Sequence, residues 1–472
     1  MLECLLISPD SSRENYQALA SEYAAIESPV WAQLIAGTLD MFSMEILDPL
    51  AERLTDEQAI DRIWELKPKL ICFVVYGQNP NSGTCNMAGV ARLATKIRRV
   101  MSTPIAIVGP HASALPDETL ALDYIDYVLP GDGVQALAEL MDIGAKPKQV
   151  MWRKPYPAES FRYKRLPDYS RYRCHTWHNN FGPDRSPFAA IYTSIGCPFK
   201  CDFCMINMVN RSDASQLDAA QASGIRYFNT DMILDELEYL AGIGVKNVRI
   251  SDEMFFLNRR HYGPILNGII SRGISLNLWA YARVDTVRTA DLRLFQRAGV
   301  NWLCLGIEAG NQTVRREVTK GSFEDVDVRQ VCREIKDAGI NVLANFIFGL
   351  PDDNLDSMLE TYELAKEINA EHTNYYPCMA LPGSPLYRKA AAEGVTLPDT
   401  WSGYSFHSYD ALPLPTKHLS AKEVIAFRDS AWLSTTLNPD YLALVTAKFG
   451  PDRAAAIVEQ AKLPLKRKLL ES

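Results

Sequence analysis

Two stretches of the chain alternate short apolar runs with longer amphipathic segments, a pattern that predicts parallel sheets covered by helices. In the first stretch the amphipathic segments predict helices over 56–66 and 86–101. The apolar runs predict five strands over 4–8, 44–48, 70–77, 105–109 and 127–131. Ligands of such sheets bind in the loops after the strands, here 76–84, 109–113 and 130–133. We therefore expect a doubly wound, Rossmann-like α/β domain over residues 1–145.

The second stretch repeats the alternation six times, which predicts a partial TIM-like (β/α)6 barrel over residues 186–392. Its predicted strands are 188–196, 247–252, 276–284, 301–310, 341–349 and 373–380. Its predicted helices are 230–244, 259–273, 289–299, 323–339 and 354–368, and the first four end at a glycine. Residues 146–185 have no period, but their many aromatic residues predict an ordered linker. Residues 393–472 form a helical C-terminal region, in which we expect the basic run 466–468 to be solvated.

The composition, with 47% hydrophobic and 22% charged residues, suits a soluble globular protein. The formal charge of −8 argues against nucleic acid as the main partner, which would require a basic face. No run reaches the roughly 18 apolar residues of a membrane span, and the first residues lack the basic leader of a signal peptide. Seven of the ten cysteines are scattered, mostly in apolar runs, as buried free thiols are in a reducing cytoplasm. We therefore expect a cytoplasmic protein.

The other three cysteines, Cys197, Cys201 and Cys204, lie in the segment CPFKCDFC. A zinc site takes four ligands, and no fourth cysteine or histidine lies near. A redox C-x-x-C pair leaves Cys197 unexplained, and a fully ligated iron–sulfur cluster needs four thiolates. Three thiolates on one loop suit a four-iron cluster whose fourth iron is open to another ligand.

This segment resembles the C-x3-C-x2-C signature of the radical S-adenosylmethionine (SAM) superfamily, and the resemblance extends over residues 186–390. It implies that the three cysteines hold a [4Fe-4S] cluster and that SAM chelates the fourth iron. An electron from a donor such as flavodoxin or ferredoxin then yields a 5′-deoxyadenosyl radical, which abstracts a hydrogen atom from a small-molecule substrate.

The resemblance also implies SAM-binding roles for residues beside the cysteines and at the strand ends. Phe203 would pack near the adenine, and Asn345 begins a segment that lines the adenine pocket. The segment ISDEMF stands where the family binds the amino group, although it lacks the usual GGE. Its candidate residues are Ser251, Asp252 and Glu253.

Two further candidates have structural alternatives. Arg283 offers a fork for the SAM carboxylate, but it is also placed to pair with Asp285. Glu308 would accept hydrogen bonds from the ribose or the amino group, but it is also placed to cap the next helix. The sequence leaves both alternatives open.

The first domain resembles the cobalamin (B12)-binding domain that precedes the barrel in one radical SAM class. The matching segments are 81–84, 109–120 and 125–140, and no D-x-H-x-x-G motif is present. In that class this implies a cobalt whose lower face lacks a histidine. The candidate cobalamin-binding residues are Ser82, Thr84, Gly109, His111, Gly131 and Asp132. The alternative is a domain kept only as a scaffold.

Three functions follow from these resemblances. The first is cobalamin-dependent methylation of an unactivated carbon in a small molecule, sugar-like if the aromatic and polar segment 401–418 contacts it. The alternative is a radical dehydratase, epimerase or cyclase without methyl transfer, in which the first domain is structural. The third, a non-catalytic sensor, leaves Arg283 and Glu308 without a role.

Overall fold

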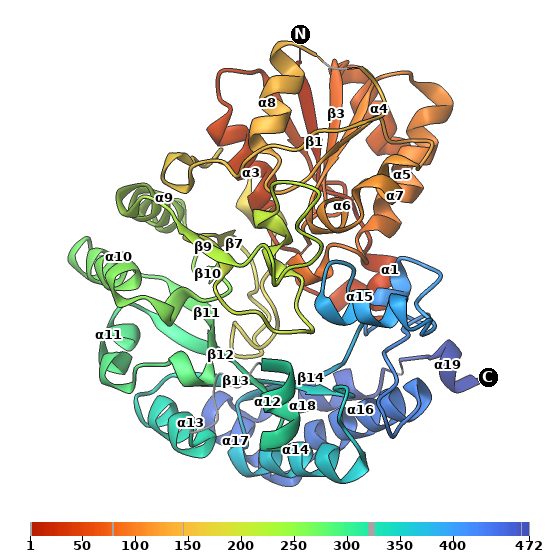
Figure 1. Cartoon of the computed structure of the whole chain (residues 1–472). Helices are drawn as coiled ribbons and strands as arrows, with labels where there is room; N and C mark the ends of the chain where they lie inside the picture. The colour runs from red at the N-terminus through yellow and green to blue at the C-terminus, as the bar shows by residue number, and fades with distance from the viewer. Residues whose placement is uncertain (1, 78–79, 145, 320–325, 464, 472) are drawn as a thin grey trace.

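The computed structural model describes residues 2–77, 80–144, 146–319, 326–463 and 465–471. Two parallel sheets form the two main bodies, with the first domain (red to orange) above the barrel (green to cyan) in Figure 1. Parts of three predictions lie outside the described residues. They are residues 78–79 of a ligand loop, the domain boundary at 145 and the start of the helix predicted over 323–339.

The first domain is built on a parallel sheet with the strand order β2-β1-β3-β4-β5-β6. The strands are β1 (Cys4–Ile7), β2 (Met44–Leu47), β3 (Leu70–Val74), β4 (Ile105–Val108), β5 (Tyr127–Leu129) and β6 (Gln149–Val150). The helices are α1 (Ser12–Tyr16), α2 (Leu19–Glu22), α3 (Val30–Thr38), α4 (Asp56–Leu66), α5 (Met87–Val100), α6 (Pro110–Ala114), α7 (Pro116–Leu120) and α8 (Val134–Asp142). Every residue of β1, β3 and β4 is buried, as in a sheet with helices on both faces. The doubly wound α/β fold is confirmed.

The segment 146–185 is ordered but almost without regular structure. Its first residues form β6, which adds a sixth strand to the predicted five. Beyond β6, Phe161, Cys174 and His178 are fully buried, so the segment packs as part of the core. Phe161 packs between Trp31 of the first domain and Phe228 of the barrel domain, whereas Trp177 and Phe181 pack on barrel strands and C-terminal helices.

The barrel is an open parallel sheet whose six strands follow chain order, which confirms the partial (β/α)6 barrel. The strands are β7 (Phe188–Ile191), β10 (Asn247–Ile250), β11 (Asn277–Arg283), β12 (Val300–Glu308), β13 (Asn341–Phe348) and β14 (His372–Pro377). The helices are α9 (Thr230–Gly242), α10 (Arg259–Ser271), α11 (Leu292–Arg297), α12 (Gln312–Thr319), α13 (Val328–Asp337), α14 (Leu355–Ile368) and α15 (Pro385–Ala392). The glycines predicted to end four helices all have a left-handed φ, between 64° and 88°.

The strand predicted over 188–196 is two strands. After β7 the chain leaves the barrel sheet, and β8 (Ser194–Cys197) pairs antiparallel with β9 (Gly224–Tyr227). The cause lies at the end of β10, where the buried Asp252 accepts hydrogen bonds from the backbone N–H and hydroxyl of Thr193 and from the hydroxyl of Ser194. Cys197 is therefore the last residue of β8, and Cys201 and Cys204 lie in the long connection between β8 and β9, not directly after the first barrel strand.

The C-terminal region packs beside the last barrel strands (Figure 1). Its helices are α16 (Ala421–Thr436), α17 (Pro439–Phe449), α18 (Pro451–Ala461) and α19 (Lys468–Glu471). The expectation of a solvated basic run is wrong for Arg467, which is 2% exposed and pairs with Asp429. Within the part of the chain that the structure describes, no helix is both long and apolar enough to cross a membrane.

Candidate active site

A cavity of about 310 Å³ lies where the carboxyl ends of the barrel strands face the first domain. Four parts of the chain line it: the first domain, the cysteine loop, the barrel strand ends and the C-terminal segment. The lining from the first domain is Tyr16, Asn81, Ser82 and Cys85, and that from the C-terminal segment is Tyr404, Ser405, Phe406 and His407. The two domains therefore line one shared space, at the edge where α/β sheets bind ligands.

Cys197, Cys201 and Cys204 all line this cavity. The loop that carries them is fixed from both domains, because the Asn207 Oδ1 accepts from the Cys197 N–H at 2.8 Å and the Asn81 Oδ1 accepts from the Met205 N–H at 3.2 Å. Burial raises the pKa of Cys197 and of Cys201 to about 12. The free thiols are therefore protonated, and ligation of iron requires them to lose their protons.

The donor set of the loop bears on which metal group it could hold. All three thiols face one shared space, and iron–sulfur clusters are held by cysteine thiolates. The chemistry of the donor set, three cysteines with no fourth on the loop, fits the cluster that the resemblance implies.

Of the three candidate residues Ser251, Asp252 and Glu253, only Glu253 lines the cavity. Its Oε1 is buried without a hydrogen-bond partner, and burial raises its pKa to about 8. The Asp252 carboxylate is occupied by hydrogen bonds from Thr193 and Ser194. Ser251 is 1% exposed, and its hydroxyl has no partner among the described residues.

Arg283, at the end of β11, reaches the cavity beside the cysteine loop. Its Nε and Nη2 donate to the two carboxylate oxygens of Asp285 at 2.6 and 2.5 Å, as the structural alternative predicted. Its guanidinium carbon also lies 3.5 Å from the ring centroid of Phe199. Arg283 therefore connects the strand end to the loop that carries the cysteines.

Glu308 ends β12 with a left-handed φ of 66°, a conformation that costs a non-glycine residue free energy. Its side chain lines the cavity, and burial raises its pKa to about 7 despite the nearby Arg283 and Arg315. A Cβ on Gly306 would come within 2.7 Å of the Glu308 Oε1, so the glycine makes room for this carboxyl. The side chain turns back toward the strand end and does not cap the next helix.

Phe203 and Asn345 also line the cavity. The Asn345 Nδ2 donates to the Leu305 carbonyl at 3.1 Å, and its Oδ1 accepts from Asn374 at 3.2 Å. Sequence reasoning missed Tyr281 and Tyr376, which line the same space. Tyr281 lies two residues before Arg283 on one strand, so the two-residue period of a strand would have found it.

A second cavity, of about 110 Å³, opens at the carboxyl ends of β1, β2 and β3. Tyr16, Ser82 and Cys85 line both this cavity and the one that holds the cysteines. Ser8, Ser11 and Ser12 line the smaller space, and serine hydroxyls can bond the amide groups of a large ligand. The ligand-binding edge of the first sheet therefore faces the cysteines, a placement that fits cobalamin.

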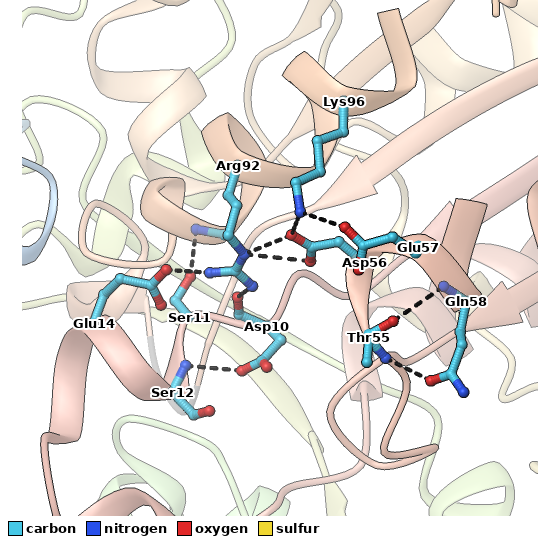
Figure 2. Close-up of polar contacts among 11 residues, drawn as sticks. Asp10, Ser11, Ser12, Glu14, Thr55, Asp56, Glu57, Gln58, Arg92 and Lys96 are labelled. Carbon is cyan, nitrogen blue, oxygen red and sulfur yellow. Dashed lines mark hydrogen bonds and ion pairs between the residues drawn. The ribbon is translucent and has the colours of Figure 1, made fainter. Parts of the chain in front are cut away.

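The wall of this smaller cavity is held by ion pairs between three helices (Figure 2). Arg92 on α5 pairs with Glu14 on α1, with Asp56 on α4 at 3.1 Å, and donates to the Asp10 carbonyl at 2.7 Å. Lys96 bonds the same Asp56 at 2.8 Å. These contacts fix the loop after β1, and with it the serines that face the cavity.

Asp48 also lines the smaller cavity, and its replacement by asparagine is expected to stabilise the protein above neutral pH. Burial raises the pKa of Asp48 from 3.8 to about 7. The unfolded chain therefore loses this proton at lower pH than the folded chain, so folding stability falls as the pH rises from about 4 to about 7. Asp48→Asn removes that loss, a gain of about 2–4 kcal/mol at pH 8 and little at pH 4. Thermal unfolding at both pH values tests this, with the exposed Asp61→Asn as the control; an equal shift at both pH values would contradict it.

The other first-domain candidates lie away from both cavities. The His111 Nδ1 bonds the Thr84 hydroxyl at 3.1 Å, its ring lies against Trp401, and burial lowers its pKa to about 4. Gly109 starts the helix that carries His111.

Gly131 and Asp132 instead join the first domain to the barrel. A Cβ on Gly131 would come within 2.6 Å of the Arg211 carbonyl, and the Asp132 carboxylate pairs with Arg226 at 3.1 Å. Their roles in cobalamin binding, like those of Thr84, Gly109 and His111, stay predictions.

Comparisons with known proteins agree with this two-part site. The B12 binding domain model matches residues 16–141, and the radical SAM superfamily model matches residues 191–365. An uncharacterized methyltransferase of Pyrococcus horikoshii is 23% identical over 87% of this chain and 88% of its own. An anaerobic magnesium-protoporphyrin IX monomethyl ester cyclase of Rubrivivax gelatinosus is 23% identical over 79% of this chain and 68% of its own.

Among solved structures, the radical SAM methyltransferase TsrM from Kitasatospora setae, with cobalamin and a [4Fe-4S] cluster bound, has the same fold. Its TM-score is 0.66 at 17% identity, over 93% of this chain and 90% of that chain. A radical SAM domain implies a [4Fe-4S] cluster and SAM, and a B12-binding domain implies cobalamin. Since the two domain models together match more than half of the chain, it is an enzyme that belongs to the radical SAM superfamily, in the class with an N-terminal B12-binding domain.

Proposed function

We propose that this enzyme methylates an unactivated carbon of a small molecule in a cobalamin-dependent reaction. The observation that carries the proposal is the shared lining of the two cavities. Tyr16, Ser82 and Cys85 face the space at the first sheet's ligand edge and also the space that contains the cysteines. A methyl donor on one side and a radical source on the other would reach one substrate between them.

When bound, the cluster supplies the electron that cleaves SAM, and cobalamin supplies the methyl group. Cys197, Cys201 and Cys204 would hold the cluster. In their deprotonated forms Glu253 and Glu308 accept hydrogen bonds from ammonium and hydroxyl groups, which suits the amino acid and ribose ends of SAM. The contact of Arg283 with Phe199 holds this strand end against the cysteine loop.

Anaerobic reconstitution with and without hydroxocobalamin tests the proposal. We expect about one corrin per chain by absorbance, formation of methylcobalamin from SAM, and 5′-deoxyadenosine in the presence of a reductant. A protein that takes up no corrin and still cleaves SAM would instead support the alternative, a radical reaction without methyl transfer. One relative is named as a cyclase, not as a methyltransferase.

We further propose a cytoplasmic location and reduction by a flavodoxin or ferredoxin. All ten cysteines are free, and the seven outside the loop are buried, which suits a reducing compartment. Reduced flavodoxin in place of a chemical reductant is expected to support SAM cleavage. No cleavage with either flavodoxin or ferredoxin would contradict the choice of donor.

A further inference from the structure

Below the cysteine cavity, the barrel interior contains a second chamber of about 210 Å³. Tyr281, Asn345 and Tyr376 on the strands and Phe406 and His407 on the C-terminal segment line both spaces. A molecule held in the chamber therefore lies directly beside the proposed site of radical chemistry.

The chamber walls are aromatic and almost uncharged. Trp177, Trp279 and Trp432 contribute apolar faces. The Trp279 Nε1 and the His407 Nδ1 are buried and have no hydrogen-bond partner among the described residues. None of the described residues that line the chamber is Asp, Glu or Lys, so its walls offer no carboxylate to a cationic ligand.

One charged side chain does line the chamber, the guanidinium of Arg428. It is 3% exposed, and it donates through Nε to the Tyr375 carbonyl at 2.7 Å and through Nη1 to Asp429 at 2.8 Å. Its Nη2 makes no hydrogen bond with the described residues. Arg467, which is also buried, binds the same Asp429 through Nε and Nη2 at 2.8 and 2.9 Å.

Two buried guanidiniums thus share one carboxylate, which leaves one positive charge at the chamber wall. Two other buried arginines lie near the chamber: Arg249 pairs with Glu27 behind His175 at 2.5 Å. Arg185 donates to backbone carbonyls, among them those of Tyr23 and Ala24 at 3.1 Å, and does not line the chamber as Arg428 does. A buried charge without a counterion is costly. The charge of Arg428 therefore calls for an anion from outside the chain, and a ligand in the chamber can provide it.

We infer that this chamber binds a carboxylic acid with a flat apolar body, its carboxylate on Arg428 and its rings among the tryptophans. The inference rests on the proposed function, because it takes this acid as the methyl acceptor. Binding itself is independent of the methyl-transfer step. The class differs from the sugar-like substrate expected from the segment 401–418, which would carry no charge.

Isothermal titration of the reconstituted holoenzyme with 2-naphthoate and 2-naphthamide tests the inference, since the two probes match in shape and differ in charge. We expect naphthoate to bind at least about tenfold more tightly, the effect of one charge-assisted hydrogen bond. Arg428→Gln should remove this preference. Equal binding of both probes, or binding of neither, overturns the inference.

Because Arg428 also binds the Tyr375 carbonyl, its replacement could disturb the fold. A second variant therefore tests the effect of charge and leaves Arg428 in place. Gln460 on α18 lines the chamber, and Gln460→Glu is expected to weaken naphthoate about fivefold or more by repulsion while naphthamide binding is kept. Ala456→Glu adds the same charge to the exposed face of that helix and should change neither affinity. If both variants weaken naphthoate equally, the chamber assignment is wrong. Corrin uptake and SAM cleavage, measured on the same samples, separate this result from failure of the proposed function.

Discussion

Replacing Cys201 with alanine is expected to abolish both the brown absorbance of the iron–sulfur cluster and the formation of 5′-deoxyadenosine. The reason is the number of ligands. With three thiolates on the loop, only two remain after the substitution, and iron–sulfur clusters are held by cysteine thiolates. Absorbance and SAM cleavage after anaerobic reconstitution measure the two losses.

The cavity itself provides the controls, because Cys85 and Cys378 also line it. Cys85 comes from the first domain, where its thiol donates to the Ser82 carbonyl at 3.2 Å, and Cys378 follows β14. Cys85→Ala and Cys378→Ala are expected to keep the cluster absorbance. Loss of the cluster in either control, or its retention in Cys201→Ala, would show that a different set of three thiols holds the iron.

Much of the fold follows from local pattern. The apolar runs of β1, β3 and β4 are buried at every position, so their composition alone identifies strands of a doubly covered sheet. In the barrel, the glycines that end helices were readable because only a residue without a side chain adopts the left-handed φ easily. These features depend on neighbours in sequence, and a sequence displays them directly.

The prediction failed where a distant residue decides local structure. The run 188–196 is mostly apolar, and its two hydroxyl residues, Thr193 and Ser194, do not by themselves show that the chain leaves the sheet there. The turn is made by Asp252, 59 residues later in the chain. The same bonds remove Asp252 from the cavity, so one long-range contact explains both the broken strand and the misplaced site residue.

The sequence also did not predict that the candidate cobalamin-binding residues of the first domain are buried, because their partners are distant in sequence. His111 follows a strand as a ligand-binding residue would, but Trp401 from the far end of the chain lies against its ring. Gly131 and Asp132 occupy the correct loop and instead meet Arg211 and Arg226 of the barrel. The position of a residue in a loop predicts at which edge of the sheet it lies. It does not predict which residue of the other domain it contacts there.

The backbone conformation and the burial of Glu308 both destabilise the folded protein. Its φ of 66° is unfavourable for a side chain, and its carboxyl is buried with a pKa raised to about 7. Glycine at this position would avoid both costs. Such strain persists where a function requires the side chain, and here the carboxyl faces the cavity that we propose for SAM.

Glu308→Gly is therefore expected to raise the thermal stability of the protein and to weaken SAM binding in the same variant. The backbone term alone is roughly 1–2 kcal/mol, and the lost hydrogen bonds to SAM should cost more than about tenfold in affinity. Thermal unfolding without SAM and equilibrium dialysis of SAM with the reconstituted enzyme measure the two effects. Lys67→Gly is the matched control, because Lys67 has a φ of 48° at the exposed end of α4 and should gain stability without any change in SAM affinity. A Glu308→Gly variant that binds SAM as tightly as the unaltered enzyme would contradict the role proposed for this carboxyl. The strained conformation would then not be explained by SAM binding.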